Sequence, residues 1–261
     1  MRNSILSLVA GGATLIAGSA SALPMIQFDL LESRFVNAVG GNVLTIDNTF
    51  GDPSQVCWGQ AGLNPCTKSS GFTYTNSTTP FSENPNDVFA LGEFTHYNLP
   101  INENASIKSV QLEITGTISA AEDGGPWAAI GQRTFIFDIM HNETLNGDNP
   151  CKSSVPDVTD PVNAAGCADE VTMSIASGSE YFTVGLTNFT LEILGVSMSL
   201  EDAGNGIFTP TFLSSENAVN SRIIAAQFTA TPTTPVPLPA ALPLMGAGLA
   251  VLGFAARRRR S

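Results

Sequence analysis

This 261-residue chain contains two histidines, His96 and His141. Their side chains are the ones best suited to ligand or metal chemistry. His96 belongs to the segment Thr95-His96-Tyr97-Asn98. If this segment is extended, His96 and Asn98 share one face, so an imidazole and an amide can form a small polar cluster. The cluster could bind a ligand or a metal ion, or it could bond to loop backbone and fix the start of the next strand. We expect the second, structural role.

His141 stands between two carboxylates, Asp138 and Glu143, at the end of an expected strand. The three could be metal ligands, but we expect an ordinary solvated strand end. Acidic loops rich in Gly and Asn could bind Ca²⁺ through oxygen ligands, yet none has the spacing of an EF-hand, so we expect turns. These loops are residues 122–125, 146–149 and 201–205. No metal site or cofactor is therefore predicted, and Ca²⁺ is the ion that these acidic loops could bind.

Two tryptophans, Trp58 and Trp127, could each stack on a sugar ring, although both could equally be buried. The sequence strings typical of serine hydrolases, zinc proteases, P-loop proteins and dinucleotide-binding enzymes do not occur. Paired carboxylates for glycoside hydrolysis are not readable from sequence, because their spacing is spatial. We predict that the protein is not an enzyme and keep a secreted hydrolase as a lesser alternative.

The four cysteines fall into two local pairs, each spanning a loop rich in Pro, Gly or Asn. Local pairing is the simplest of the three connectivities and predicts the disulfides Cys57–Cys66 and Cys151–Cys167. Each would stabilise the fold by roughly 3 kcal/mol in the chain-entropy model and would indicate an oxidising compartment. A zinc site is the rival interpretation, but no C-x-x-C spacing supports it.

Both ends of the chain carry targeting signals. At the C-terminus, residues 238–256 are uncharged and long enough to span a bilayer as a helix, and Arg257–Arg260 follow at once. Clustered arginines are retained in the cytoplasm, so the rest of the chain is expected outside. At the N-terminus, Arg2, an apolar stretch and Ala20-Ser21-Ala22 predict a signal peptide over residues 1–22 that signal peptidase removes.

The segment before the apolar helix resembles the PEP-CTERM class of bacterial sorting signals. A linker rich in Pro and Thr, residues 231–237, leads into the motif Val236-Pro237-Leu238-Pro239-Ala240. This motif is most similar to the variant named for the string VPLPA, although Leu238 replaces the Glu of the founding motif. The resemblance implies that residues 236–261 are recognised and cut by an exosortase-type membrane transpeptidase. An uncleaved C-terminal anchor is the alternative.

The body between these ends is strongly acidic. All 23 acidic residues lie in it, whereas five of the 11 basic residues lie in the two ends, so its net charge is −17 at pH 7. Such a surface repels nucleic acid and anionic lipid and favours solubility and association with divalent cations. We therefore expect no nucleic-acid partner.

Residues 23–230 are predicted to form one all-β domain, an antiparallel β-sandwich of jelly-roll type. Short segments with alternating apolar residues and β-branched side chains are separated by turn residues, and no amphipathic helix of ordinary length competes with them. No strand is expected in the polar region 54–87. The expected strands are 25–31, 42–48, 107–119, 133–140, 171–175, 181–186, 189–198 and 222–229.

The segment around His96 resembles the signature of the THxN family of PEP-CTERM proteins. The residues that carry this resemblance are Phe94-Thr95-His96-Tyr97-Asn98-Leu99-Pro100-Ile101, after Leu91-Gly92-Glu93, with Trp58-Gly59 upstream. It covers residues 56 to about 230 and implies no established activity. We expect an exported, structural or adhesive protein of the bacterial envelope or extracellular matrix. The alternative is an exopolysaccharide-binding module that uses Trp58 or Trp127.

Overall fold

The computed structural model describes residues 23–42, 45–48, 53–59, 69–77, 81–101, 105–122, 124–176 and 180–233. The predicted signal peptide, sorting motif and membrane-spanning helix lie outside these residues. Within the described ranges, no helix has the length and apolar character needed to cross a membrane.

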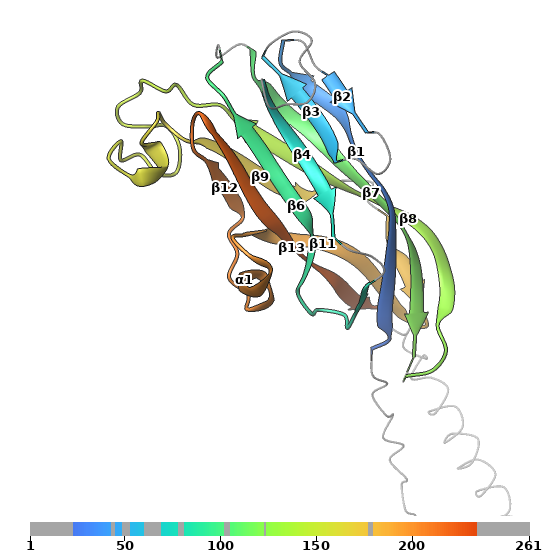
Figure 1. Cartoon of the computed structure of the whole chain (residues 1–261). Coiled ribbons are helices and arrows are strands. Elements are labelled where there is room, and N and C mark those ends of the chain that lie inside the picture. The colour runs from blue at the N-terminus through green and yellow to red at the C-terminus, as the bar shows by residue number, and fades with distance from the viewer. Residues whose placement is uncertain are drawn as a thin grey trace, which may run out of the picture.

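The described chain folds into two antiparallel sheets that pack face to face, which confirms the prediction of an all-β antiparallel sandwich (Figure 1). The first sheet has six strands, which in spatial order are β12 (Thr211–Ser214), β9 (Asp169–Ile175), β8 (Ala128–Asn142), β7 (Ile107–Ala121), β1 (Met25–Gly40) and β5 (Phe81–Glu83).

The second sheet has seven strands, with β6 and β13 near its centre. In spatial order they are β10 (Phe182–Val184), β11 (Thr187–Ser197), β13 (Ala218–Pro232), β6 (Phe89–Asn98), β4 (Ser70–Asn76), β3 (Ser54–Trp58) and β2 (Thr45–Asp47). One helix of five residues, α1 (Leu200–Gly204), begins after the N-cap Ser199, whose side chain accepts from the amide of Asp202.

Aromatic side chains from both sheets fill the space between them. The alternation expected for β7 and β8 is confirmed, because Phe135, Phe137 and Ile139 are fully buried while their neighbours are more exposed. The rings of Phe28 on β1 and Phe228 on β13 meet edge to face, with centroids 6.0 Å apart. The core is therefore shared by the two sheets.

The prediction that residues 54–87 contain no strand is wrong, because β3, β4 and β5 lie there. Val56, Phe72 and Tyr74 are fully buried in β3 and β4, but Ser, Thr and Gly between them dilute the apolar pattern. One of these small polar residues bonds across the sandwich: the Ser54 hydroxyl on β3 donates to the carbonyl of Ser33 on β1 of the other sheet.

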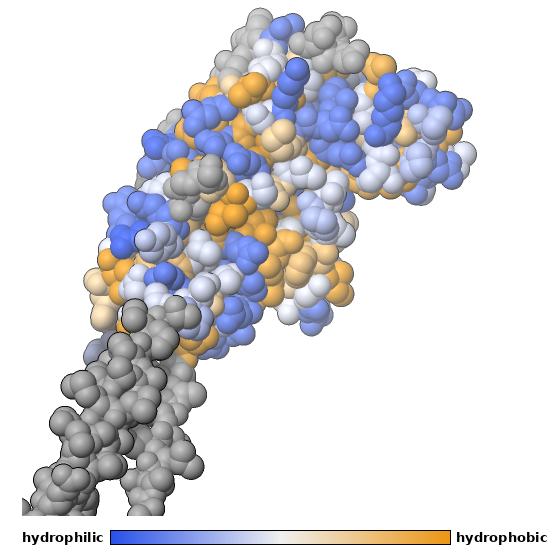
Figure 2. Space-filling model, turned by 180° about the vertical axis from the view of Figure 1, so that it is seen from behind, coloured by the Kyte–Doolittle hydropathy of each residue, from blue (hydrophilic) through white to orange (hydrophobic). Residues whose placement is uncertain are grey.

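Both ends of the described body leave the sandwich at the same end, where β1 begins and β13 stops (Figure 1). The connection from β8 to β9, drawn in yellow, projects at the opposite end. Figure 2 shows the molecule from behind, with mostly hydrophilic residues over this projection. We call this end of the sandwich the distal end.

Candidate functional site

The two histidines meet between the sheets at the distal end. His96 comes from β6 in one sheet and His141 from the last residues of β8 in the other, and their ring centroids lie 5.0 Å apart. His96 is fully buried and His141 is 7% exposed. As expected, His96 and Asn98 share the inner face of an extended segment, while the Thr95 hydroxyl bonds to that of Ser221.

The His141 ring is oriented by two groups that precede or begin β7. Its Nδ1 lies 3.1 Å from the carbonyl oxygen of Ile107 and 3.0 Å from the hydroxyl of Ser106. Because a carbonyl can only accept, the proton of a neutral ring belongs on Nδ1. The Nε2 lone pair then faces the Oδ2 of Asp169, 3.5 Å away.

The expectation of a solvated strand end at Asp138, His141 and Glu143 is wrong for His141, which is buried. Successive strand residues point to opposite faces, so His141 turns inward three residues after Asp138. The Asp138 carboxylate lies away from the cluster and accepts a hydrogen bond from Gln111 at 2.9 Å.

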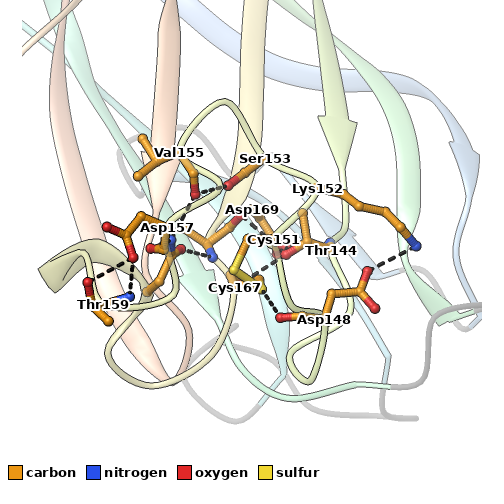
Figure 3. Close-up of a disulfide and its surroundings, with 12 residues drawn as sticks. Thr144, Asp148, Cys151, Lys152, Ser153, Val155, Asp157, Thr159, Cys167 and Asp169 are labelled. Carbon is orange, nitrogen blue, oxygen red and sulfur yellow. Dashed lines mark hydrogen bonds and ion pairs between the residues drawn. A yellow bond between two sulfur atoms is a disulfide. The ribbon is translucent and has the colours of Figure 1, made fainter.

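Asp169 at the start of β9 is fully buried, and its carboxylate is also held in place. Its Oδ1 accepts from the backbone amide of Thr144 at 2.8 Å and lies 3.3 Å from the Thr144 hydroxyl. The same hydroxyl donates to the carbonyl of Cys167 at 2.7 Å. Figure 3 shows Thr144 and Asp169 next to the disulfide, so the loop around this bond supports the Asp169 carboxylate.

His96 is held by packing rather than by hydrogen bonds. Trp58 stacks on its ring with centroids 5.8 Å apart, and the ring of Phe72 contacts it edge-on at 4.9 Å. Burial, and then the neighbouring His141, lowers the pKa of His96 well below its ordinary value, so the ring is neutral. Neither of its ring nitrogens has a hydrogen-bond partner in the described part of the chain.

We expected the side chains of His96 and Asn98 to form hydrogen bonds with the backbone. The Asn98 side chain does so, whereas the His96 ring does not. The Asn98 amide donates to the carbonyl of Ser214 at 3.0 Å. His96 lies opposite Phe72 of β4 and Asn220 of β13, so strand pairing on both sides already engages the nearby backbone.

Two further carboxylates, Glu143 and Glu216, lie beside Asp169. One oxygen from each of the three can be chosen so that all lie within 4.8 Å of one another. Burial, and then the charge of Asp169, raises the pKa of Glu143 to about 8 and that of Glu216 to about 7. A contact with Ser106 opposes the shift of Glu143. Three acidic groups thus share one poorly solvated space.

The site brings together side chains of the kinds that can hold a metal ion. One donor atom each from His96, His141 and Asp169 lies within 4.8 Å of the others. We call these three residues together with Glu143 and Glu216 the distal cluster. Sequence reasoning missed Asp169 and Glu216, which lie far from His96 along the chain and carry no motif of their own.

Trp58 and Trp127 have different surroundings. Trp58 is fully buried against Phe72 and both histidines, so it offers no face to a sugar, and its assignment as a carbohydrate platform is wrong. The expected strands did not include residues 54–58. These residues form β3, which places the Trp58 indole between the sheets. Trp127 is 42% exposed.

One predicted disulfide, Cys151–Cys167, is present and closes the projecting connection at the distal end (Figure 3). Cys57 is also disulfide-bonded. Its predicted partner, Cys66, lies outside the described residues.

The comparisons with known proteins add no constraint on the site. No protein-family model matches this sequence, and a search of curated proteins finds no match.

Proposed function

We propose that this chain is an exported, structural or adhesive protein of the bacterial envelope or extracellular matrix, a jelly-roll-like sandwich presented by its C-terminal sorting signal. One observation carries the proposal: both ends of the described body lie at one end of the sandwich and the disulfide-closed projection at the other (Figure 1). A chain held at residues 236–261 would present the distal end outward.

Three features of the chain support export. A disulfide that persists in the folded protein is typical of an oxidising compartment. The N-terminal 22 residues have the order of a signal peptide, and the C-terminal residues have the order of proline motif, apolar run and arginine cluster. Signal peptidase and an exosortase-type transpeptidase are the partners that this order implies.

Fractionation of a bacterium that carries an exosortase tests the proposal. When the full chain is expressed, we expect a shortened product in the envelope or matrix, with an intact mass that places the new C-terminus between Val236 and Ala240. Replacing Pro237 and Pro239 by Ala should block processing and leave the longer chain, because the proline-held extended backbone is lost. Replacing Thr231 and Thr233 by Ala is the matched control and should be processed normally. Recovery only of chains that still carry Arg257–Arg260 would contradict processing, and a cytoplasmic chain would contradict export.

Binding of exopolysaccharide is a second candidate function, favoured by an open hollow of about 770 Å³. It is lined in part by Arg133, Glu180 and Tyr181, and Tyr181 is 64% exposed. An exposed aromatic face beside charged groups can stack on a sugar ring and bond to its hydroxyls. In affinity electrophoresis with the host polysaccharide, Tyr181→Ala should abolish retardation, whereas Tyr97→Ala should not. Equal retardation of the unmodified protein and the two variants would exclude this hollow as the polysaccharide-binding site.

A further inference from the structure

We propose that His96, His141 and Asp169 bind one divalent ion of the zinc class, which joins the two sheets at the distal end. This site is independent of export and of the sorting signal. A carboxylate oxygen of Glu143 or Glu216 would supply a fourth ligand.

The distances fit a single ion. Bonds from zinc to imidazole nitrogen and carboxylate oxygen are about 2.0–2.2 Å, so two ligands of one tetrahedral ion lie about 3.3–3.6 Å apart. The separation between His141 Nε2 and Asp169 Oδ2 is 3.5 Å. One ring nitrogen of His96 lies within 4.8 Å of a donor atom from each of the other two residues, so small side-chain adjustments bring it into range.

The surrounding hydrogen bonds orient His141 and Asp169 as a metal site requires, whereas His96 is held by packing. Metal-binding histidines usually donate their second ring N–H to a carbonyl or carboxylate, as His141 does to Ile107. Asp169 is fixed through its other oxygen by Thr144. Two lone pairs therefore face each other, and a cation between them turns repulsion into attraction.

A proton on His141 is the other way to satisfy this pair. It would make an imidazolium that pairs with the Asp169 carboxylate. It would leave His96 unexplained, because both nitrogens of this fully buried ring lack partners among the described residues. A buried polar side chain without a partner is strongly unfavourable. One metal ion would give a partner to one nitrogen of each ring, and the second nitrogen of His96 would still have none among the described residues.

The charges in the cluster also favour a divalent ion. Three buried or half-buried carboxylates lie together, and the lysine and arginine ion pairs of the described chain are elsewhere, at Arg34–Glu113 and Lys152–Asp148. A divalent cation would offset most of the negative charge that these three groups carry when they are ionised together, which burial otherwise makes costly.

The donor set selects the class of metal. Ca²⁺ and Mg²⁺ prefer oxygen ligands alone, whereas two imidazoles with carboxylates suit zinc and its neighbours in the first transition row. Trp58 covers His96, and the hollow lined by Tyr181 contains no residue of the distal cluster. The burial of His96, His141 and Asp169 fits a closed, structural ion site better than an open, catalytic one.

Titration of the folded, metal-stripped protein with Co²⁺, followed by visible absorption, tests this site. We expect d–d bands that saturate at one equivalent and disappear when one equivalent of Zn²⁺ is added. His96→Ala and Asp169→Asn should lose the bands or weaken binding at least 100-fold. Asp138→Asn, on the other face of β8, is the matched control and should bind as the unmodified protein does.

Thermal melting of the unmodified chain keeps the test independent of whether the variants fold. Adding EDTA should lower the melting temperature, and one equivalent of Zn²⁺ should restore it, whereas Ca²⁺ should not. The proposal is overturned if the stripped protein takes up no Co²⁺ or Zn²⁺, if only Ca²⁺ restores stability, or if folded His96→Ala binds unchanged.

Discussion

Trp58 packs against both histidines of the distal cluster. Its indole is fully buried and contacts the rings of Phe72, His96 and His141. It thereby keeps water from the two histidines and fixes the position of the His96 ring, which has no hydrogen bond of its own in the described structure. The Trp58 indole therefore contributes to the distal cluster by packing against its two histidines.

Replacing Trp58 by Ala should destabilise the protein by about 3–5 kcal/mol, because a large buried ring is lost and a cavity remains. Urea unfolding with and without Zn²⁺ measures both the loss and the expected weakening of metal binding. Trp127→Ala is the control, since Trp127 is 42% exposed, and should change stability by no more than about 0.5 kcal/mol. Equal losses in the two variants would contradict the assigned roles.

The sequence was sufficient to predict that His96 and Asn98 share a face, since the side-chain period of a strand is two. It was not sufficient to identify what His96 faces. Asp169 reaches it, and Glu216 reaches Asp169, only because β9 and the turn after β12 lie across the sandwich from β6, which is a property of sheet order.

At the scale of elements, β1 and β7 pair along nearly their whole length and approach closely where β7 carries Gly116. A Cβ added at Gly116 would lie 2.2 Å from the Phe28 ring and 2.9 Å from the carbonyl oxygen of Asp29. The glycine therefore makes room for a core aromatic ring on the neighbouring strand.

Gly116→Ala should lower the free energy of unfolding by about 1–3 kcal/mol, because Phe28 is fully buried and has little space to move. Gly147→Ala is the matched control, since nothing lies within 4 Å of an added Cβ there. Chemical denaturation of both variants measures the difference. A Gly116→Ala protein as stable as the control would show that β1 and β7 lie farther apart at Gly116 than described above.

The projecting connection between β8 and β9 is a second element with a testable role. Its disulfide, Cys151–Cys167, ends two residues before Asp169, and Thr144 bonds to both Cys167 and Asp169. Replacing both cysteines by Ser should cost about 3 kcal/mol and also weaken zinc binding, because the Asp169 carboxylate loses support.

Lys152→Ala is the control for this loop. It removes an ion pair with Asp148 at 2.9 Å in which Lys152 is 70% exposed, and such pairs contribute at most about 1 kcal/mol. Calorimetric titration with Zn²⁺ compares the variants. Unchanged zinc affinity in the folded double Ser variant would show that the disulfide does not support the metal site.

Strand prediction succeeded where apolar residues alternate and failed where they are diluted. The pattern in β7 and β8 is unbroken, whereas β3 and β4 bury Ser54 and Ser70 next to their apolar residues. Buried hydroxyls satisfied by backbone carbonyls, as in Ser70 with Leu99, have no signature in a hydropathy pattern.

At the scale of the whole molecule, two sheets share an aromatic core and join again at the distal end through the cluster. The termini of the described body lie at the other end (Figure 1). A metal ion at the distal end would connect β6 of one sheet to β8 and β9 of the other, far from any attachment through the C-terminal segment. Stability at that end would then depend on the metal content of the surroundings.

An anomalous difference map tests the metal centre most directly. Crystals of the full chain grown with one equivalent of Zn²⁺ would be measured just above and just below the zinc absorption edge. We expect one strong peak between the two histidines and Asp169, about 2.0–2.2 Å from their donor atoms. A map with no peak there, or with zinc only on surface carboxylates, would contradict a metal site between the sheets.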